Sequence, residues 1–141
     1  MELQVRTAGR VELTDITARI QEVVTHSGLR EGMVHLFVLH TTAGITINEN
    51  ADPDVVSDLL SGLERMVPAT APYRHAEGNS PAHLKASLMG FSLQVPVASG
   101  RLALGTWQGI YLCEFDGPRT RRLRITLFPA PPQAPEPEEG T

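Results

Sequence analysis

The chain has 141 residues, of which 41% are hydrophobic and 20% are charged, and its formal net charge is −4. This length suits one domain, and the composition is that of an ordinary globular protein. No apolar run reaches the roughly 20 residues that a membrane-spanning helix needs, and the N-terminus lacks the order of a signal peptide, so we expect a cytoplasmic protein with no membrane partner. No basic stripe with interleaved aromatic residues indicates nucleic-acid binding.

The first half of the chain predicts strands around one helix. Alternation of apolar and polar residues predicts short strands at 3–6, 11–13 and 44–48. Apolar residues recur at helical spacing over 16–24, and Gly28 can end that helix by adopting left-handed backbone. Residues 33–40 form a near-continuous apolar run, which suits a central strand that is covered on both faces.

Two further helices are expected next. Asp52 can bond the free amides of a first helical turn, and proline at 53 is tolerated there, so a helix begins at that point and continues to Met66. Ser80 and Pro81 start a shorter helix that runs to about Met89.

The C-terminal part predicts four strands, at 91–97, 101–104, 109–115 and 121–128. Their short links favour an antiparallel meander. The expected fold class is therefore α+β, an antiparallel β-sandwich or meander with two or three helices, in a single domain over 1–128. Residues 129–141 are rich in proline and glutamate, and we expect a disordered or extended tail there.

Polar side chains are dense in 40–52, directly after the apolar run. Sites are often built at strand ends, so this segment is a candidate for chemistry. Glu49 is a poor capping residue there, and we expect it to act as a general acid or base. Asp52 either caps the following helix or orients a ligand or water. Asn48 either supports a turn or binds substrate.

A second polar segment, 73–85, contains two more histidines. A reversal from loop to helix could bring His75 and His83 to one point, and His40 would make a third ligand. Three protein ligands and an open position are typical of catalytic zinc. The alternative is that each histidine is an isolated hydrogen-bonded residue. Lys85 either is solvated or binds a substrate phosphate.

The remaining candidates lie in the last three strands and their turns. Trp107 either packs in the core or forms a pocket wall beside Gln108. Arg119 belongs to a local basic run, which is either a solvated face or a holder of an anionic substrate. Glu114 either faces solvent or is paired inside a site. Cys113, the only cysteine, is interpreted as a small apolar residue on a strand.

Together these segments resemble the YjbQ-like family, whose members are also labelled secondary thiamine-phosphate synthase enzymes. The matching stretches are 40–53, 73–85, 104–109 and 114–119. The short His75-Ala-Glu-Gly-Asn-Ser80 form is similar to the archaeal-type branch. The resemblance implies a homotrimer with sites near subunit interfaces and a divalent metal held by His40, His75 and His83, with zinc expected and magnesium as the alternative.

The resemblance and the residues support one main hypothesis and two rivals. The main hypothesis is a metal-assisted enzyme that acts on a small phosphorylated substrate. The family label implies a secondary transferase activity, thiamine-phosphate synthesis, which joins a pyrimidine diphosphate to a thiazole phosphate with loss of pyrophosphate. The alternative is a non-enzymatic homotrimer that binds a ligand or a metal. The third hypothesis is a scaffold in which the histidines never meet.

Overall fold

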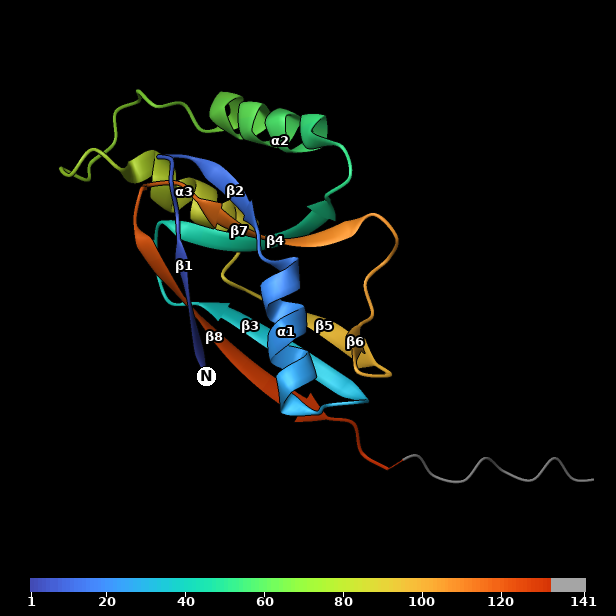
Figure 1. Ribbon diagram of the computed structural model, residues 1–141. Coiled ribbons are helices and arrows are strands. Elements are labelled where there is room, and N and C mark those ends of the chain that lie inside the picture. The colour runs from blue at the N-terminus through green and yellow to red at the C-terminus, as the bar shows by residue number, and fades with distance from the viewer. Residues whose placement is uncertain (133–141) are drawn as a thin grey trace, which may run out of the picture.

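The computed structural model describes residues 1–132 of the chain and places eight strands and three helices in that range (Figure 1). The elements, in chain order, are β1 (Glu2–Arg6), β2 (Glu12–Asp15), α1 (Thr17–Ser27), β3 (Gly32–Val38), β4 (Ala43–Glu49), α2 (Pro53–Met66), α3 (Ser80–Met89), β5 (Ser92–Ala98), β6 (Arg101–Leu102), β7 (Gln108–Glu114) and β8 (Thr120–Pro129). None of the helices within 1–132 is long and apolar enough to cross a membrane.

The strands form two antiparallel sheets, which confirms the predicted α+β class. The larger sheet has the order β1-β8-β3-β5-β6, and the smaller has the order β2-β7-β4. The main core contains buried residues from both sheets, including Leu36 of β3, Leu112 of β7 and Leu123 of β8, which are all 0% exposed. Burying each such side chain stabilises the fold by about 1.5–3 kcal/mol.

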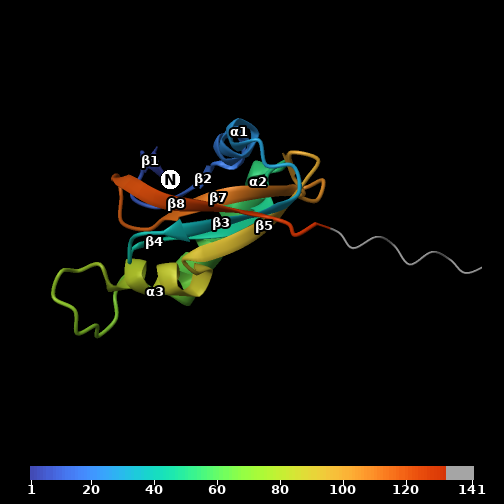
Figure 2. The same cartoon turned by 90° about the horizontal axis from the view of Figure 1, so that it is seen from below.

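The helices cover different sides of this sandwich. α1 contributes Ile20 and Val24 to the main core. α3 lies on the opposite side of the sheets from α1 (Figure 2). There, Ala82 and Ala86 of α3 pack with Cys113 of β7 in a second, smaller cluster. The smaller sheet is therefore buried on both faces.

Local signals set the helix ends as the sequence predicts. Gly28 follows α1 with φ 74°, and its N–H donates to the carbonyl of Thr25. Asp52 caps α2, since its carboxylate accepts from the N–H of Asp54 at 2.9 Å. α3 begins at Ser80, as expected, and ends at Met89.

Strand order and strand cover differ from the sequence predictions. Among the last four strands, only β5 and β6 pair with each other, because β7 joins the smaller sheet and β8 lies between β1 and β3. β3 is central, as predicted, but within one chain only one of its faces is covered. Val34, Leu36 and Val38 are buried, whereas Phe37 is 42% exposed.

The expected tail can be compared with the structure only at its start. β8 extends to Pro129, one residue past the predicted domain boundary. Residues 133–141 lie outside the described part of the chain, so the predicted disorder of that segment stays a prediction.

The close approach of β4 to the end of α3 requires a glycine at 44. A Cβ on Gly44 would lie 2.7 Å from the carbonyl oxygen of Gly90 and 3.2 Å from Cβ of Met89. The N–H of Ile45 also donates to that carbonyl at 3.0 Å, so the backbones cannot separate without losing a hydrogen bond.

We therefore expect Gly44→Ala to destabilise the protein by about 1–3 kcal/mol through overpacking. Gly62 is the matched control, because it lies inside α2 and a methyl group on its Cα would meet nothing within 4 Å. Gly62→Ala should stabilise the protein by about 0.5–1 kcal/mol. Denaturant unfolding measures both, and equal effects of the two substitutions would contradict the predicted backbone contact.

Candidate functional site

His40 lies just past the end of β3 and is held by the backbone of β8. Its Nε2 accepts a hydrogen bond from the N–H of Arg122 at 2.8 Å. An accepting Nε2 leaves the proton of the neutral ring on Nδ1. Burial lowers the pKa of His40 below its ordinary value, and the positive charges of Arg121 and Arg122 lower it further. Both effects favour the neutral imidazole at this position.

His75 and His83 form a close pair beside this end of the sandwich. Their ring centroids are 5.3 Å apart in an edge-to-face arrangement. His75 belongs to the loop before α3, and its Nε2 lies 3.6 Å from Oε2 of Glu77, while His83 is in the first turns of α3. Together with neighbours such as Tyr73 and Leu84 they line a surface hollow of about 360 Å³.

One chain does not complete the three-histidine metal site. Within residues 1–132, no group of three or more histidine, cysteine, aspartate or glutamate side chains is placed to hold a metal ion. A catalytic zinc site needs three protein ligands, and the pair of His75 and His83 supplies two. The residues of a single chain therefore do not fit a complete zinc site.

A buried ion pair lies behind His40. Glu114 of β7 is 0% exposed and Arg121 of β8 is 3% exposed. Nε of Arg121 donates to both carboxylate oxygens of Glu114, at 2.9 and 3.1 Å. The hydroxyl of Thr7 donates to the same carboxylate at 2.7 Å, and the guanidinium of Arg121 donates to Oγ1 of Thr42 at 2.9 Å. The pair thus joins four separate parts of the chain.

The surroundings of Glu114 favour the ionised form of its carboxyl group. Burial is the largest influence, and it raises the pKa of the carboxyl. Hydrogen bonds from Arg121, Thr7 and the N–H of Asp116, together with the charge of Arg121, outweigh burial and bring the pKa of Glu114 below its ordinary value. Of the two alternatives for Glu114, the structure therefore selects the paired one.

Arg121, the partner of Glu114, is not among the residues that the sequence singles out. In the sequence it belongs to a basic run, yet it has the same strand phase as the buried Leu123 and Ile125. Strand periodicity could therefore have placed Arg121 inside the sandwich. Arg122 and Arg124 have the opposite phase and are exposed, as expected for a solvated face.

Arg119 and Lys85, the predicted anion holders, both have carboxylate partners. Arg119 donates to the carbonyl and the carboxylate of Asp116, at 2.7 and 3.2 Å, and its side chain is 56% exposed. Lys85 is not solvated, because it is only 3% exposed, and its ammonium forms an ion pair with Glu64 of α2.

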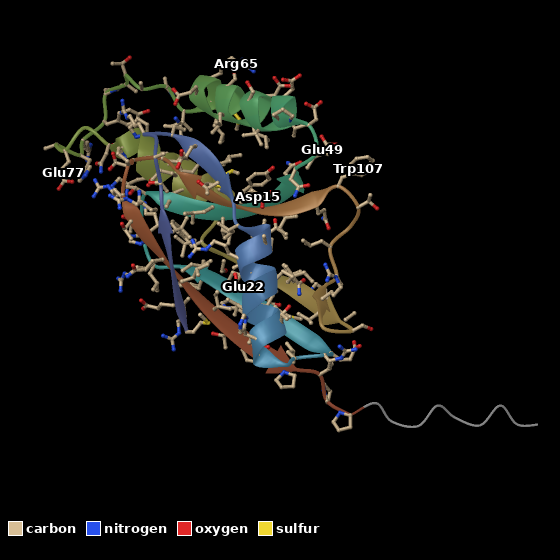
Figure 3. The ribbon with its side chains drawn as sticks, in the orientation of Figure 1. Asp15, Glu22, Glu49, Arg65, Glu77 and Trp107 are labelled. Carbon is tan, nitrogen blue, oxygen red and sulfur yellow. The ribbon has the colours of Figure 1, made fainter. Side chains whose placement is uncertain are left out.

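The other predicted residues lie at the far end of β4. This strand covers six residue steps from Ala43 to Glu49, which at about 3.4 Å per step is roughly 20 Å. Figure 3 shows Glu49 and Trp107 together at one end, while Glu77, in the loop of His75, lies at the other end. The predicted site residues of one chain are thus divided between two places.

At this far end, most of the predicted polar groups take part in local hydrogen bonds. Oδ1 of Asn48 accepts from the N–H of Glu49 at 2.7 Å, and Oε1 of Gln108 accepts from the N–H of Gly105 at 2.8 Å. Asp52 is the cap of α2, which is the structural alternative for that residue. Trp107 is 61% exposed, so it does not pack in the core. Glu49 differs from its neighbours, because within residues 1–132 only its backbone N–H and carbonyl form such bonds.

Cys113 matches its interpretation as a small apolar residue. It is 0% exposed, and burial raises the pKa of its thiol to about 12. A thiol that stays protonated is a poor nucleophile, so Cys113 is a poor candidate for a catalytic nucleophile.

The buried pair yields a prediction for stability. Glu114→Leu and Arg121→Met should each destabilise the protein by about 3–5 kcal/mol, because each leaves an unpaired buried charge. The double variant should lose less than either single variant, since it buries no charge. Arg124→Met, on the exposed phase of β8, is the control and should change stability by about 0.5 kcal/mol or less. Denaturant unfolding gives the coupling energy, and additive single effects would rule out the pairing.

Comparisons with known proteins agree with this fold. A family model described as UPF0047 protein YjbQ-like matches residues 1–130. The UPF0047 protein YugU of Bacillus subtilis is 50% identical over 127 residues, covering 89% of this chain and 96% of its own length. A UPF0047 protein of Methanocaldococcus jannaschii is 46% identical over 125 residues, covering 89% and 91%. Bacterial and archaeal relatives are thus similarly close, and the expected archaeal-type branch is not supported.

Solved structures of related proteins have a similar fold. The crystal structure of an uncharacterized conserved protein of this family from Clostridium acetobutylicum has a TM-score of 0.88 at 50% identity, covering 91% of this chain and 99% of that one. A protein of unknown function from Sulfolobus solfataricus has a TM-score of 0.87 at 34% identity, covering 92% and 96%. With the family model matching almost all of the described residues, the chain belongs to the UPF0047, YjbQ-like family.

Proposed function

We propose that the chain is a homo-oligomeric enzyme for a small phosphorylated substrate, with sites shared between copies. The observation that supports this proposal is the division of the predicted residues. The connection from β3 to β4, which carries His40, and the loop before α3, which carries His75, lie at one end of the sandwich (Figure 1), and Glu49 and Trp107 lie roughly 20 Å away along β4. A shared site would join the histidine end of one copy to the Glu49 end of another.

The open face of β3 supports self-association. The run over 33–40 is apolar at nearly every position, as in a strand that is buried on both faces. In one chain, Phe37 on that face is 42% exposed, and Phe128 of the adjacent β8 is 52% exposed. A second copy on this face would bury these rings. The resemblance to YjbQ-like proteins makes a homotrimer the assembly that we propose.

Within a shared site, each residue type has a chemical role. Histidine nitrogens are common zinc ligands, so we propose that His40, His75 and His83, drawn from more than one copy, hold a divalent metal, with zinc expected and magnesium as the alternative. His40 would bind the metal only after its Nε2 releases the N–H of Arg122. Such a metal, when bound, supplies a Lewis acid for a phosphoryl oxygen. The carboxylate of Glu49 would serve as general acid or base, and Trp107 and Gln108 would line the substrate pocket beside Asn48.

Three further residues have narrower roles in this proposal. Arg119 is more than half exposed, so its guanidinium can turn toward a substrate anion while Asp116 positions it. The ammonium of Lys85 is buried and paired, so it would act on the substrate only through the pocket that it lines. Asp52 would support the Glu49 end by fixing the start of α2.

The specific activity that we propose is thiamine-phosphate synthesis, as a secondary activity of this family. It joins a pyrimidine diphosphate to a thiazole phosphate and releases pyrophosphate. The rival proposal, a non-enzymatic homotrimer that binds a ligand or a metal, uses the same residues without turnover.

Complementation between variants tests the shared site. His83→Ala and Glu49→Gln should each reduce thiamine-phosphate formation by at least tenfold as pure oligomers. When the two variants are co-expressed with different tags and purified as mixed oligomers, activity should return, because each mixed assembly pairs one intact histidine end with one intact Glu49 end. Glu22→Gln, at the middle of α1 and away from both ends (Figure 3), is the control and should keep full activity.

The outcomes separate the rival functions. Mixed oligomers that stay as inactive as the pure variants would refute a site shared between copies. A wild-type protein that binds zinc but forms no thiamine phosphate would favour the non-enzymatic alternative for this substrate pair.

Metal content tests the histidine set directly. After equilibration with zinc and removal of free ions, wild-type protein should retain about one zinc per chain by elemental analysis, the ratio expected when every copy contributes its histidines to sites that lie between copies. His75→Ala and His83→Ala should lose most of this zinc. His26→Ala, an exposed histidine near the end of α1, should retain it. Equal retention by all three variants would refute the proposed ligands.

A further inference from the structure

A small pocket lies between the start of α3 and the loop after β7. It has a volume of about 90 Å³. Val11, Ala82 and Phe115 form apolar walls, and Asn79, Lys85 and Asp116 are among its polar residues. Its size corresponds to roughly three water molecules, at about 30 Å³ each. A group of a few non-hydrogen atoms therefore fits it.

Asn79 presents an unpaired acceptor here. Its Nδ2 donates to Oδ2 of Asp116 at 3.0 Å. Because a carboxylate only accepts, the amide nitrogen must face Asp116, and Oδ1 must point away from it. Oδ1 is buried and has no hydrogen-bond partner among residues 1–132.

The position of Asn79 makes this arrangement unusual. It is the N-cap residue of α3, where a side-chain oxygen commonly accepts from an N–H of the first turn. Asn79 makes no such bond, and its backbone carbonyl accepts from the N–H groups of Ala82 and His83 instead. A buried acceptor without a partner is unfavourable, so a donor from outside the chain is expected at Oδ1.

Lys85 supplies the complementary groups. Its ammonium has three N–H donors, and among the described residues only the carboxylate of Glu64 accepts from it. Since Lys85 is 3% exposed, bulk water does not readily reach the remaining donors. The pocket therefore offers free donors from Lys85 and a free acceptor from Asn79.

The charges of the pocket are already compensated. Lys85 is paired with Glu64, and Asp116 is paired with Arg119. Arg10 also lines the pocket, but it is exposed, where solvent and salt weaken its field. Because each of these charges has an opposite partner, the pocket has little remaining charge to offset the desolvation of an anion or a cation. Neither charged class suits this site.

We propose that this pocket binds a neutral group in which a hydrogen-bond donor and an acceptor lie side by side, such as a primary amide or the amino edge of a nitrogen heterocycle. The donor of that group bonds Oδ1 of Asn79, and its acceptor bonds Nζ of Lys85. The inference goes beyond the proposed function, because it needs neither a metal nor a second copy of the chain.

Three probes of nearly equal size test this selectivity. Acetamide carries a donor and an acceptor, acetate carries acceptors only, and acetamidinium carries donors only. Each is titrated into full-length protein at matched ionic strength, and the backbone amide NMR signals of Asn79, Lys85 and Asp116 are followed. Acetamide should shift these signals saturably, with an affinity at least tenfold higher than that of either charged probe.

Variants locate the binding groups. Asn79→Ala should abolish saturable binding of acetamide while leaving α3 folded, because the Asn79 side chain makes no capping bond. Lys85→Met keeps the length of the side chain and should weaken binding at least tenfold. Asn50→Ala, which removes an exposed asparagine that is bonded to Asp15 instead, is the control and should not change it.

Several results would overturn the proposal. Absence of saturable shifts with acetamide would mean that the pocket holds water only. Acetate binding as tightly as acetamide, or unchanged acetamide binding by Asn79→Ala, would refute the assigned contacts. Failure of complementation between oligomers would leave this result unaffected, so the two proposals can fail separately.

Discussion

The buried ion pair of Glu114 and Arg121 is the contact on which the candidate site depends. Glu114 is the last residue of β7 in the smaller sheet, and Arg121 is the second residue of β8 in the larger sheet. The pair therefore joins the two sheets at the end where the histidines lie. Thr7, after β1, and Thr42, before β4, bond the same two charges. A well-packed apolar pair could provide similar stability, but it would not make the hydrogen bonds to Thr7 and Thr42.

Hydrogen bonds connect this ion pair to the candidate site residues around it. Arg122, next to Arg121, donates its N–H to His40. The N–H of Asp116 donates to Glu114, and the carboxylate of Asp116 accepts from Asn79 and Arg119. One buried pair thus orients the ring of His40 and the walls of the pocket at α3. A fully hydrogen-bonded buried network of this kind can hold the polar side chains at this end of the sandwich in one conformation.

Helices are predictable from this sequence because their signals are local. The cap at Asp52 and the left-handed Gly28 act within one turn of the helices that they delimit. Strand order is less predictable because pairing is non-local. Short links suggest that β7 pairs with β6 or β8, but it pairs with β2 and β4. No local pattern distinguishes these partners.

The sequence indicates which residues are candidates for the site, but it does not indicate which of them lie close together in space. His40 and Glu49 are nine positions apart in a segment that is dense in polar side chains, which suggests one site. Most of that interval is an extended strand, and extension converts a short sequence separation into a long distance. The T-shaped contact of His75 and His83, in contrast, follows from a loop and a helix start, which bring nearby residues back together.

The pairing of β4 keeps Glu49 and His40 of one chain apart, which favours a site shared between copies. β4 is paired with β7 along its whole length, from Ala43 opposite Glu114 to Glu49 opposite Gln108. Bending the strand enough to bring Glu49 to His40 would break most of these backbone hydrogen bonds, each a net contribution of about 0.5–1.5 kcal/mol. Rearrangement within one chain is therefore far less favourable than contact between copies, which breaks none of them. If the histidines and Glu49 act on one substrate, that substrate binds where two chains meet.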